Sequence, residues 1–261
     1  MAIVYNIIIQ DLKISALKIK GIMKLTLNDL LPFLFWSPSL PCPYLAGRYE
    51  RRLVADISNG DPIEIHEQLS DIGFRRSHGV MYRPVCNNCC ECIPVRVFLG
   101  DFILSRSQKR VLSKNNDLRA KIVPAIATQE QYLLFGKYQL ERHSLGEMGK
   151  MGFKEYRSMI EESPIQTSII EFRDLQETLL GCLLIDHTVN GTSAVYSFFD
   201  PDHSKRSIGK YMILWLIKFT MNVNKDYVYL GYWVEGSTNM AYKSMFKPLQ
   251  YYIENNWVLK K

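Results

Sequence analysis

The sequence contains no long apolar run. No segment reaches the roughly 20 consecutive apolar residues that a membrane-spanning helix needs. The mostly apolar first ten residues are soon interrupted by Asp11 and Lys13, and they lack the basic start and the small-residue cleavage site of a signal peptide. Internal repeats and low-complexity tracts are absent as well. We therefore expect a folded cytoplasmic protein that neither spans a membrane nor is anchored to one.

Cysteine is scarce and crowded. Four of the six cysteines lie within residues 86–92, a spacing that does not suit a disulfide network and favours a reducing compartment. Cys86, Cys89 and Cys92 have the spacing of thiolates that share a tetrahedral zinc ion, with the fourth ligand supplied by another Cys or His. Reduced thiols that pack a turn are the alternative. The sequence thus leaves a structural zinc open and requires no other cofactor.

The composition is that of a globular enzyme, with 47% hydrophobic and 22% charged residues in a chain of 261. A chain of this length buries roughly three quarters of its unfolded surface, in one large or two small domains. The formal net charge is +6, yet residues 72–121 alone carry ten Lys or Arg against three Asp or Glu. Such a concentration of positive charge indicates a polyanionic partner, with a solvated basic surface as the alternative.

Apolar and alternating runs in the second half predict a layered α/β (α+β) domain. The predicted strands cover residues 167–172, 179–186, 193–199, 226–233 and 251–258, and the predicted helices cover 207–221 and 239–246. The Asn190-Gly191 pair is a hairpin signal between two of these strands. Upstream, helical patterns cover 105–112 and 129–145, and short strands are expected around the cysteine-rich turn.

These patterns suggest three parts. Residues 1–30 form an extension without a clear pattern, in which Met23 is an alternative start. Residues 31–125 form an N-terminal, cysteine-containing subdomain, and residues 126–261 form a C-terminal domain with a mixed, mainly antiparallel sheet.

The turn before the helix at 207–221 is the first candidate for chemistry. Arg206 and Gly209 flank the predicted cap Ser207, and a helix N-terminus with a nearby glycine offers backbone N–H groups to phosphate oxygens. The turn resembles the pyrophosphate-binding turn of acetyl-CoA-dependent N-acetyltransferases. The alternative is a capped helix whose glycine allows close packing.

Arginines interleaved with aromatic residues are the second candidate. Guanidinium groups bind phosphates and carboxylates through two parallel hydrogen bonds, and aromatic rings stack on an unpaired terminal base. Most of these arginines are expected to be solvated and a few to be ligands. The series is Arg48, Arg51, Arg75, Arg76, Arg83, Arg96, Arg106 and Arg110.

Eight motifs in order along the chain resemble the bacterial aspartate/glutamate leucyltransferases, from about residue 31 to residue 257. The motifs are Cys42-Pro43-Tyr44-Leu45-x-Gly47-Arg48, Gly73-Phe74-Arg75-Arg76-Ser77, Tyr82-Arg83-Pro84-x-Cys86-x-x-Cys89-x-x-Cys92-x-Pro94-Val95-Arg96, Ser105-Arg106-Ser107-Gln108-x-Arg110, Tyr138-x-x-x-Arg142-His143, Ser193-Ala194-Val195-Tyr196-x-Phe198-Phe199-Asp200-Pro201, Leu230-Gly231-Tyr232-Trp233-Val234 and Met240-Ala241-Tyr242-Lys243. The chain departs from the family at Ala46 and Cys90, and it lacks the paired Cys-x-x-Cys of the eukaryotic arginyl relatives.

The resemblance implies an acyltransferase-like C-terminal domain of the N-acetyltransferase type. It also implies leucyl-tRNA as the donor and, as acceptors, proteins that begin with Asp or Glu, which the added leucine marks for degradation in the N-degron pathway. Within the motifs, Arg48, Arg83 and Arg142 are candidate substrate-binding residues, together with Arg206 and Gly209 of the helix turn.

An aminoacyl ester is already activated, so positioning and electrostatics are expected to carry most of the rate. Asp200 is our first candidate for the proton acceptor, although a turn cap is an equal alternative. Tyr196 and Tyr232, with Tyr229, can offer hydroxyl groups to the tetrahedral intermediate or pack as core. His143 is a candidate proton shuttle or a structural histidine. The cations expected to bind the acidic acceptor side chain are Arg75, Arg76 and Lys243.

Three other functions remain open. Arginyl transfer to the same acceptors requires a donor pocket with a buried acidic residue, whereas leucyl transfer requires an apolar one. Acetyl-CoA-dependent N-acetylation is supported by the domain pattern alone. A non-enzymatic, tRNA-binding zinc module predicts bound metal and salt-sensitive RNA binding without transfer.

Overall fold

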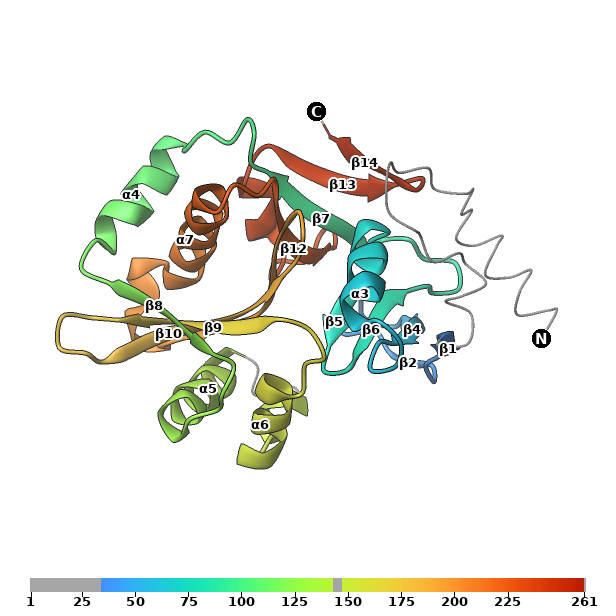
Figure 1. Ribbon diagram of the computed structural model, residues 1–261, viewed down its shortest axis with the longest axis horizontal. Helices are drawn as coiled ribbons and strands as arrows, with labels where there is room; N and C mark the ends of the chain where they lie inside the picture. The colour runs from blue at the N-terminus through green and yellow to red at the C-terminus, as the bar shows by residue number, and fades with distance from the viewer. Residues whose placement is uncertain (1–33, 143–146, 261) are drawn as a thin grey trace.

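The computed structural model describes residues 34–142 and 147–260, and its centre is an eight-stranded sheet with helices on both faces (Figure 1). All neighbouring strands of this sheet pair antiparallel except β11 and β12, which are parallel. This confirms the expected mixed, mainly antiparallel sheet. The strand order is β14 (Asn256–Leu259), β13 (Leu249–Ile253), β7 (Ile93–Phe98), β12 (Tyr227–Trp233), β11 (Gly191–Phe199), β10 (Leu179–His187), β9 (Thr167–Arg173) and β8 (Arg119–Pro124).

The predicted hairpin joins β10 to β11. Gly191 begins β11 directly opposite Tyr227 of the parallel strand β12. A Cβ atom on Gly191 would lie 2.3 Å from the Tyr227 carbonyl oxygen. Only glycine therefore fits where the hairpin meets the start of β12.

Two layers of helices cover the sheet (Figure 1). One layer contains α7 (Ile208–Asn222) and α4 (Arg106–Lys114), and the other contains α5 (Gln129–Arg142) and α6 (Phe153–Glu161). Met212, Leu216 and Ile217 of α7 are fully buried in the core, which explains why the sequence of this helix is apolar almost all round. α4 begins with a capping box formed by Ser105 and Gln108. In the described part of the chain, no helix is both long and apolar enough to cross a bilayer.

A second, four-stranded sheet contains the N-terminal residues and has its own core, which includes Leu53, Ile57, Leu69 and Met81. It packs with α3 (Pro62–Asp71), a helix that the sequence patterns did not reveal. The order of its strands is β1 (Leu34–Trp36), β4 (Arg52–Asp56), β6 (Val80–Pro84) and β5 (Arg75–Ser77). Between β1 and β4 in the sequence, β2 (Leu40–Pro41) and β3 (Tyr49–Glu50) form a separate two-stranded ladder.

The domain boundary that we expected near residue 125 does not separate the two sheets. β7 and β8 precede it in the chain, yet β7 lies between β12 and β13 and β8 forms an edge of the large sheet. Strand pairing over such distances leaves no local sequence pattern. The extension at residues 1–30, with Met23, lies outside the described residues.

Three local expectations need correction. The strand expected at 251–258 is the hairpin of β13 and β14, whose turn residues Glu254 and Asn255 have positive φ values. The helix expected at 239–246 is a short 3-10 helix, η4 (Ala241–Met245). Ser207 precedes α7, but its side chain does not cap the helix, because its left-handed backbone (φ 56°) instead ends the 3-10 helix η3 (Pro201–Arg206).

Candidate functional site

The large sheet opens between its two parallel strands. β11 and β12 pair only through the residues up to Ser193 and Tyr229, and beyond them the two strands are not paired. β12 also shifts register against β7 between Tyr229 and Gly231. The carbonyl of Val195, in the unpaired part of β11, is therefore free for a side chain from another element.

Arg75 from β5 of the small sheet fills this opening. Its Nη2 donates a hydrogen bond to the Val195 carbonyl oxygen. Gly231, at φ +72°, makes room for it, since a Cβ atom there would lie 2.8 Å from Arg75 Nη1. The hydroxyl groups close enough to interact electrostatically with this guanidinium belong to Tyr44, Tyr82, Tyr232 and Tyr242. Both sheets thus contribute to one half-buried, tyrosine-lined cation site.

Lys243 of η4 lies beside Arg75. Its side chain is buried, with the residue 5% exposed, and Nζ donates a hydrogen bond to the Tyr232 carbonyl oxygen. Burial, with Arg75 nearby, lowers the pKa of Lys243 to about 7. Within the described residues, neither Arg75 nor Lys243 forms an ion pair with a carboxylate. We call Arg75, Tyr196, Tyr232, Tyr242 and Lys243 the arginine–tyrosine site.

Tyr196 and Tyr232, both expected to be catalytic, lie in this site with different hydrogen bonds. The Tyr232 hydroxyl lies 2.7 Å from the Tyr82 carbonyl oxygen and 3.1 Å from that of Gly73, which fastens β12 to the small sheet. The Tyr196 hydroxyl accepts a hydrogen bond from Gln139 Nε2 at 2.6 Å, so its own hydrogen is left to donate. Burial raises the pKa of Tyr196 to about 12, and this hydroxyl stays protonated at neutral pH.

Arg76 points to the other face of β5 and has a carboxylate of its own. Its Nε and Nη2 each lie 2.7 Å from an oxygen of Asp186 on β10, and both side chains are almost fully buried. Thr167 donates a further hydrogen bond to the same carboxylate at 2.9 Å. The charge of Arg76 is therefore neutralised inside the protein, and its place is structural.

Asp200, our candidate proton acceptor, lies at the end of β11 and is engaged elsewhere. It accepts hydrogen bonds from Lys137 Nζ at 2.7 Å and from the backbone of Asp202 at 2.9 Å, and it caps η3. Partial burial raises its pKa, but these bonds outweigh burial and hold the pKa below its ordinary value. This arrangement favours the turn-cap alternative.

The turn before α7 is filled by the protein itself. The Arg206 guanidinium binds Asn115 Oδ1 at 3.1 Å and forms an ion pair with Asp117. A Cβ atom on Gly209 would lie 2.9 Å from the ring of Phe199. Both observations favour close packing at this helix start over a phosphate site.

The remaining arginine candidates are dispersed. Arg83 Nη1 donates to the Ile72 carbonyl oxygen at 3.1 Å, and its guanidinium lies over the Tyr252 ring. Arg142 is exposed at the end of α5 and lies 5.7 Å from the centre of the Phe199 ring. Arg48 is exposed beside Cys89 and has no ion-pair partner in the described chain. His143 lies outside the described residues.

The cysteine cluster forms a tight turn in which Cys86 and Cys89 make an isolated β-bridge. Cys86 Sγ donates to the Arg51 carbonyl oxygen, and Cys89 Sγ accepts from Arg48 Nη1 at 3.2 Å. Over residues 34–142 and 147–260, no group of three or more His, Cys, Asp or Glu side chains is arranged to hold a metal ion. A zinc ion bound by Cys86, Cys89 and Cys92 therefore gains no support from the geometry and stays a prediction.

The fold is thus an α/β sheet that opens between two parallel strands, with a cation and hydroxyl groups in the opening. The chain belongs to the family described as arginine-tRNA-protein transferase: residues 40–110 match its N-terminal part and residues 130–253 its C-terminal part. It is thus an enzyme, an aminoacyl-tRNA-dependent transferase.

The curated relatives are more specific than the family description, because they are aspartate/glutamate leucyltransferases. The chain is 46% identical over 225 residues to the aspartate/glutamate leucyltransferase of Paramagnetospirillum magneticum, covering 86% of this chain and 92% of that protein. It is 45% identical over 227 residues to that of Rhodospirillum rubrum, covering 87% and 92%. Among solved structures, L-PGS from Bacillus licheniformis matches with a TM-score of 0.44 and 9% identity over 56% of this chain and 46% of that one.

Proposed function

We propose that this enzyme transfers leucine from leucyl-tRNA to the N-terminus of proteins that begin with Asp or Glu. The names of its relatives support the donor and the acceptors. The observation that carries the proposal in the structure is the half-buried Arg75 guanidinium, which interacts with tyrosines but with no carboxylate in the described chain. A leucine added in this way marks the acceptor for degradation in the N-degron pathway of the cytoplasm.

Arg75 fits the acidic side chain of the acceptor. A guanidinium offers two parallel donors to a carboxylate, and burial strengthens such a charge-assisted pair. Lys243, which we expected to bind the same carboxylate, has a pKa of about 7 and is only partly charged at neutral pH. Arg75 alone therefore supplies a fixed positive charge.

The surroundings favour leucine over arginine as the donor amino acid. The side chains packed beside Tyr196 are aromatic and belong to the core: the Phe135 ring centre lies 6.1 Å from that of Tyr196 and 5.6 Å from that of Phe198. A buried arginyl side chain requires a carboxylate, whereas a leucyl side chain requires an apolar wall. In the part of the chain that the structure describes, no carboxylate pairs with the cations of the site.

Lys243 fits the role of proton acceptor in the reaction, and Tyr196 fits the role of hydrogen-bond donor to the developing negative charge. The acceptor ammonium passes one proton to Lys243 Nζ, and the neutral amine attacks the ester carbonyl carbon. A carbon–nitrogen bond forms, the bond to the ribose oxygen breaks, and the second amine proton ends on that oxygen. Tyr196, whose hydroxyl hydrogen is free to donate, stabilises the developing negative charge.

Transfer assays with two charged tRNAs test the proposal. Radiolabelled leucyl-tRNA and arginyl-tRNA are each incubated with peptides that begin with Asp, Glu, Asn or Ala, and the labelled peptide is measured. We expect leucine on the Asp and Glu peptides only. Labelling of the isosteric Asn peptide at the same rate contradicts recognition of the charge, and labelling from arginyl-tRNA in place of leucyl-tRNA contradicts the donor.

A further inference from the structure

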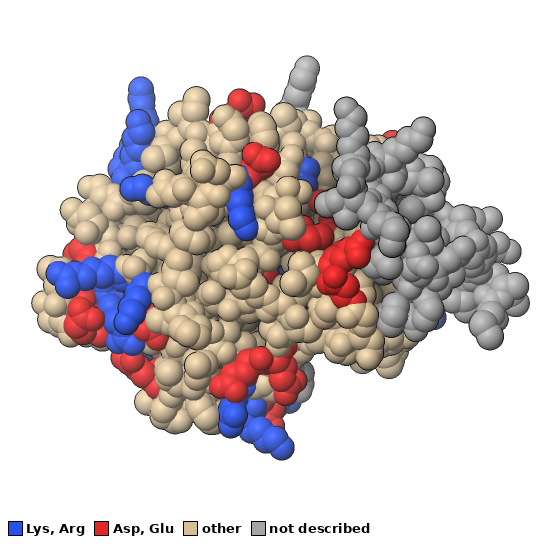
Figure 2. Space-filling view, viewed as in Figure 1, with Lys and Arg blue, Asp and Glu red and all other residues tan. Residues whose placement is uncertain are grey.

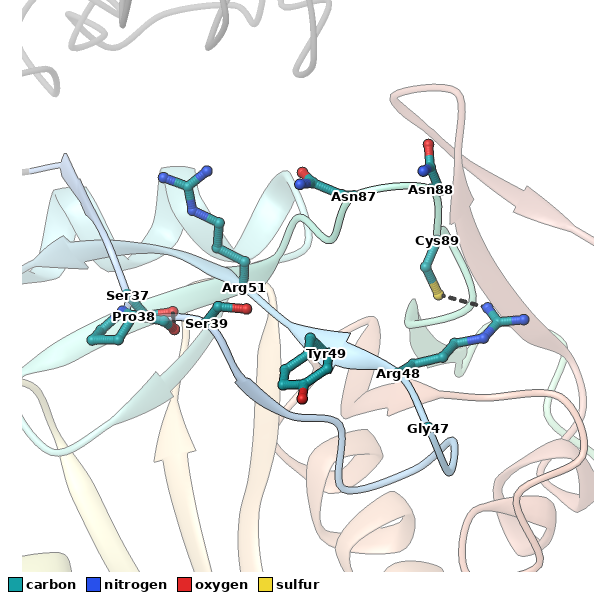
Figure 3. Close-up of a pocket in the computed structure, with 10 residues that line it drawn as sticks. All are labelled: Ser37, Pro38, Ser39, Gly47, Arg48, Tyr49, Arg51, Asn87, Asn88 and Cys89. Carbon is teal, nitrogen blue, oxygen red and sulfur yellow. Dashed lines mark hydrogen bonds between the residues drawn. The ribbon is translucent and has the colours of Figure 1, made fainter.

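An open groove lies in the N-terminal part of the molecule. None of the residues that line it belongs to the arginine–tyrosine site. Its cavity has a volume of about 710 Å³. Three segments line it, and Figure 3 shows Tyr49 between the side chains of Arg48 and Arg51 in this view. The lining residues are Ser37, Pro38, Ser39, Gly47, Arg48, Tyr49, Arg51, Asn87, Asn88 and Cys89.

The groove is positively charged. Arg48 and Arg51 are both exposed, and in the described chain neither has an ion-pair partner. None of the lining residues is Asp or Glu. By contrast, on the face shown in Figure 2 acidic and basic side chains lie close together in several places. The groove therefore presents two uncompensated cations to a ligand, which favours an anionic one.

The groove also presents a free aromatic ring. Tyr49 is 67% exposed, and no aromatic or cationic neighbour in the described chain stacks on it. The nearby Trp36 ring is already covered by the Arg51 guanidinium at 4.5 Å. Exposed aromatic rings beside cations are the usual platform for unpaired nucleic acid bases. The amide side chains of Asn87 and Asn88 add donors and acceptors for base edges.

One short loop connects the groove to the arginine–tyrosine site. The backbone N–H of Cys42 bonds to the Arg48 carbonyl oxygen at 2.8 Å, which closes the loop between β2 and β3. Tyr44 within the loop lies beside Arg75, whereas Gly47 and Arg48 line the groove. A single-stranded nucleic acid that lies in the groove can therefore end near Arg75.

We propose that this groove binds the single-stranded 3′ end of the donor tRNA, with Arg48 and Arg51 on backbone phosphates and Tyr49 stacked on a base. The assignment rests on the proposed function, because it takes tRNA as the donor. The acceptor polypeptide is the less suitable occupant: it offers one acidic side chain, whereas the groove holds two separated cations and a stacking ring. RNA supplies a phosphate and a base in every nucleotide.

Binding of uncharged tRNA to the purified full-length protein tests the site. Tyr49→Ala and Arg48→Ala are compared with Arg157→Ala, an exposed arginine of α6 that pairs with Glu161. Each is titrated with intact tRNA and with tRNA that lacks its last three nucleotides. We expect Tyr49→Ala to weaken binding of intact tRNA by about 5- to 150-fold, the range for one lost base stack, and to leave binding of the shortened tRNA unchanged. Arg48→Ala should reduce the salt dependence by about one phosphate contact.

Equal losses for intact and shortened tRNA, or no loss for either, overturn the proposal. An increased KM for the acceptor peptide with unchanged tRNA affinity assigns the groove to the acceptor instead and also overturns it. Failure of the proposed function is separate, because the wild-type protein would then transfer no leucine whatever these variants bind.

Discussion

Two adjacent arginines of β5 lie in opposite environments. Arg76 is enclosed with Asp186, which neutralises it through two bonds of 2.7 Å, and His66 Nε2 lies 3.8 Å from the same carboxylate. Arg75 reaches a backbone carbonyl and tyrosine hydroxyls, with Lys243 as a second cation nearby. One buried charge is thus balanced by the protein, and the other keeps its capacity for an external carboxylate. The difference separates an arginine whose charge is paired inside the protein from the one that we propose binds the acceptor.

Removing the carboxylate beside Arg76 should have the largest effect. We expect Asp186→Asn to lower the free energy of unfolding by about 3–5 kcal/mol, because it leaves a buried guanidinium without its counter-charge. Urea unfolding of the purified protein measures this. Asp117→Asn, at a more exposed ion pair with Arg206, is the matched control and should cost much less. Equal losses at the two positions would remove the distinction between Arg76 and an ordinary ion pair.

Removing Arg75 should affect activity more than stability. Arg75→Met deletes the cation but leaves no carboxylate unpaired, so the free energy of unfolding should change little. kcat/KM for an Asp-terminal peptide should fall by roughly 10- to 150-fold, the range for a lost hydrogen bond to a charged group. Arg119→Met is the control, because its guanidinium is exposed and lies 3.7 Å from Glu177. A loss of stability as large as that of Asp186→Asn, with unchanged kcat/KM, would reverse the roles of the two arginines.

Lys243 provides an effect that is visible only in the pH dependence of stability and rate. Below pH 7 it is charged both folded and unfolded, and the cost of burying the charge is fully present. Between about pH 7 and its ordinary pKa of 10.5, the unfolded chain binds more protons, so stability should rise by up to about 1.4 kcal/mol per pH unit. Lys243→Met should lack this rise.

Unfolding at pH 6 and pH 9 measures the difference between wild type and Lys243→Met. In transfer assays, wild-type kcat/KM should also rise through pH 7, a step that the variant should lose. A variant whose stability and rate follow the wild-type pH profiles would show that Lys243 does not titrate in this range.

Local patterns predicted much of the fold. The Asn190-Gly191 hairpin, the buried helix α7 and the three antiparallel strands β9 to β11 follow from turn chemistry and apolar periodicity. The hairpin of β13 and β14 was missed, because its turn is Glu254-Asn255 rather than a glycine-containing pair. The central position of β7 has no local signature, since its neighbours lie more than a hundred residues away.

The candidate site was only partly predictable. The sequence named Arg75, Tyr196, Tyr232 and Lys243, and the structure brings them together. The sequence also named Arg76. Alternation along a strand indicates that Arg75 and Arg76 point to opposite faces, but it does not indicate which of them contacts Asp186, 110 residues away. The groove residues Tyr49, Asn87 and Asn88 carried no signal, since exposure and shared lining are properties of the folded chain.

The central position of β7 has a consequence for the order in which the protein assembles on the ribosome. Val95 and Val97 of β7 are almost completely buried in the core. β7 itself lies between β12 and β13, which the ribosome adds more than 120 residues later. Until those residues emerge, β7 presents two unpaired edges with apolar side chains, a template for association with other chains. We therefore expect the nascent N-terminal half to be prone to association until β12 and β13 have been synthesised.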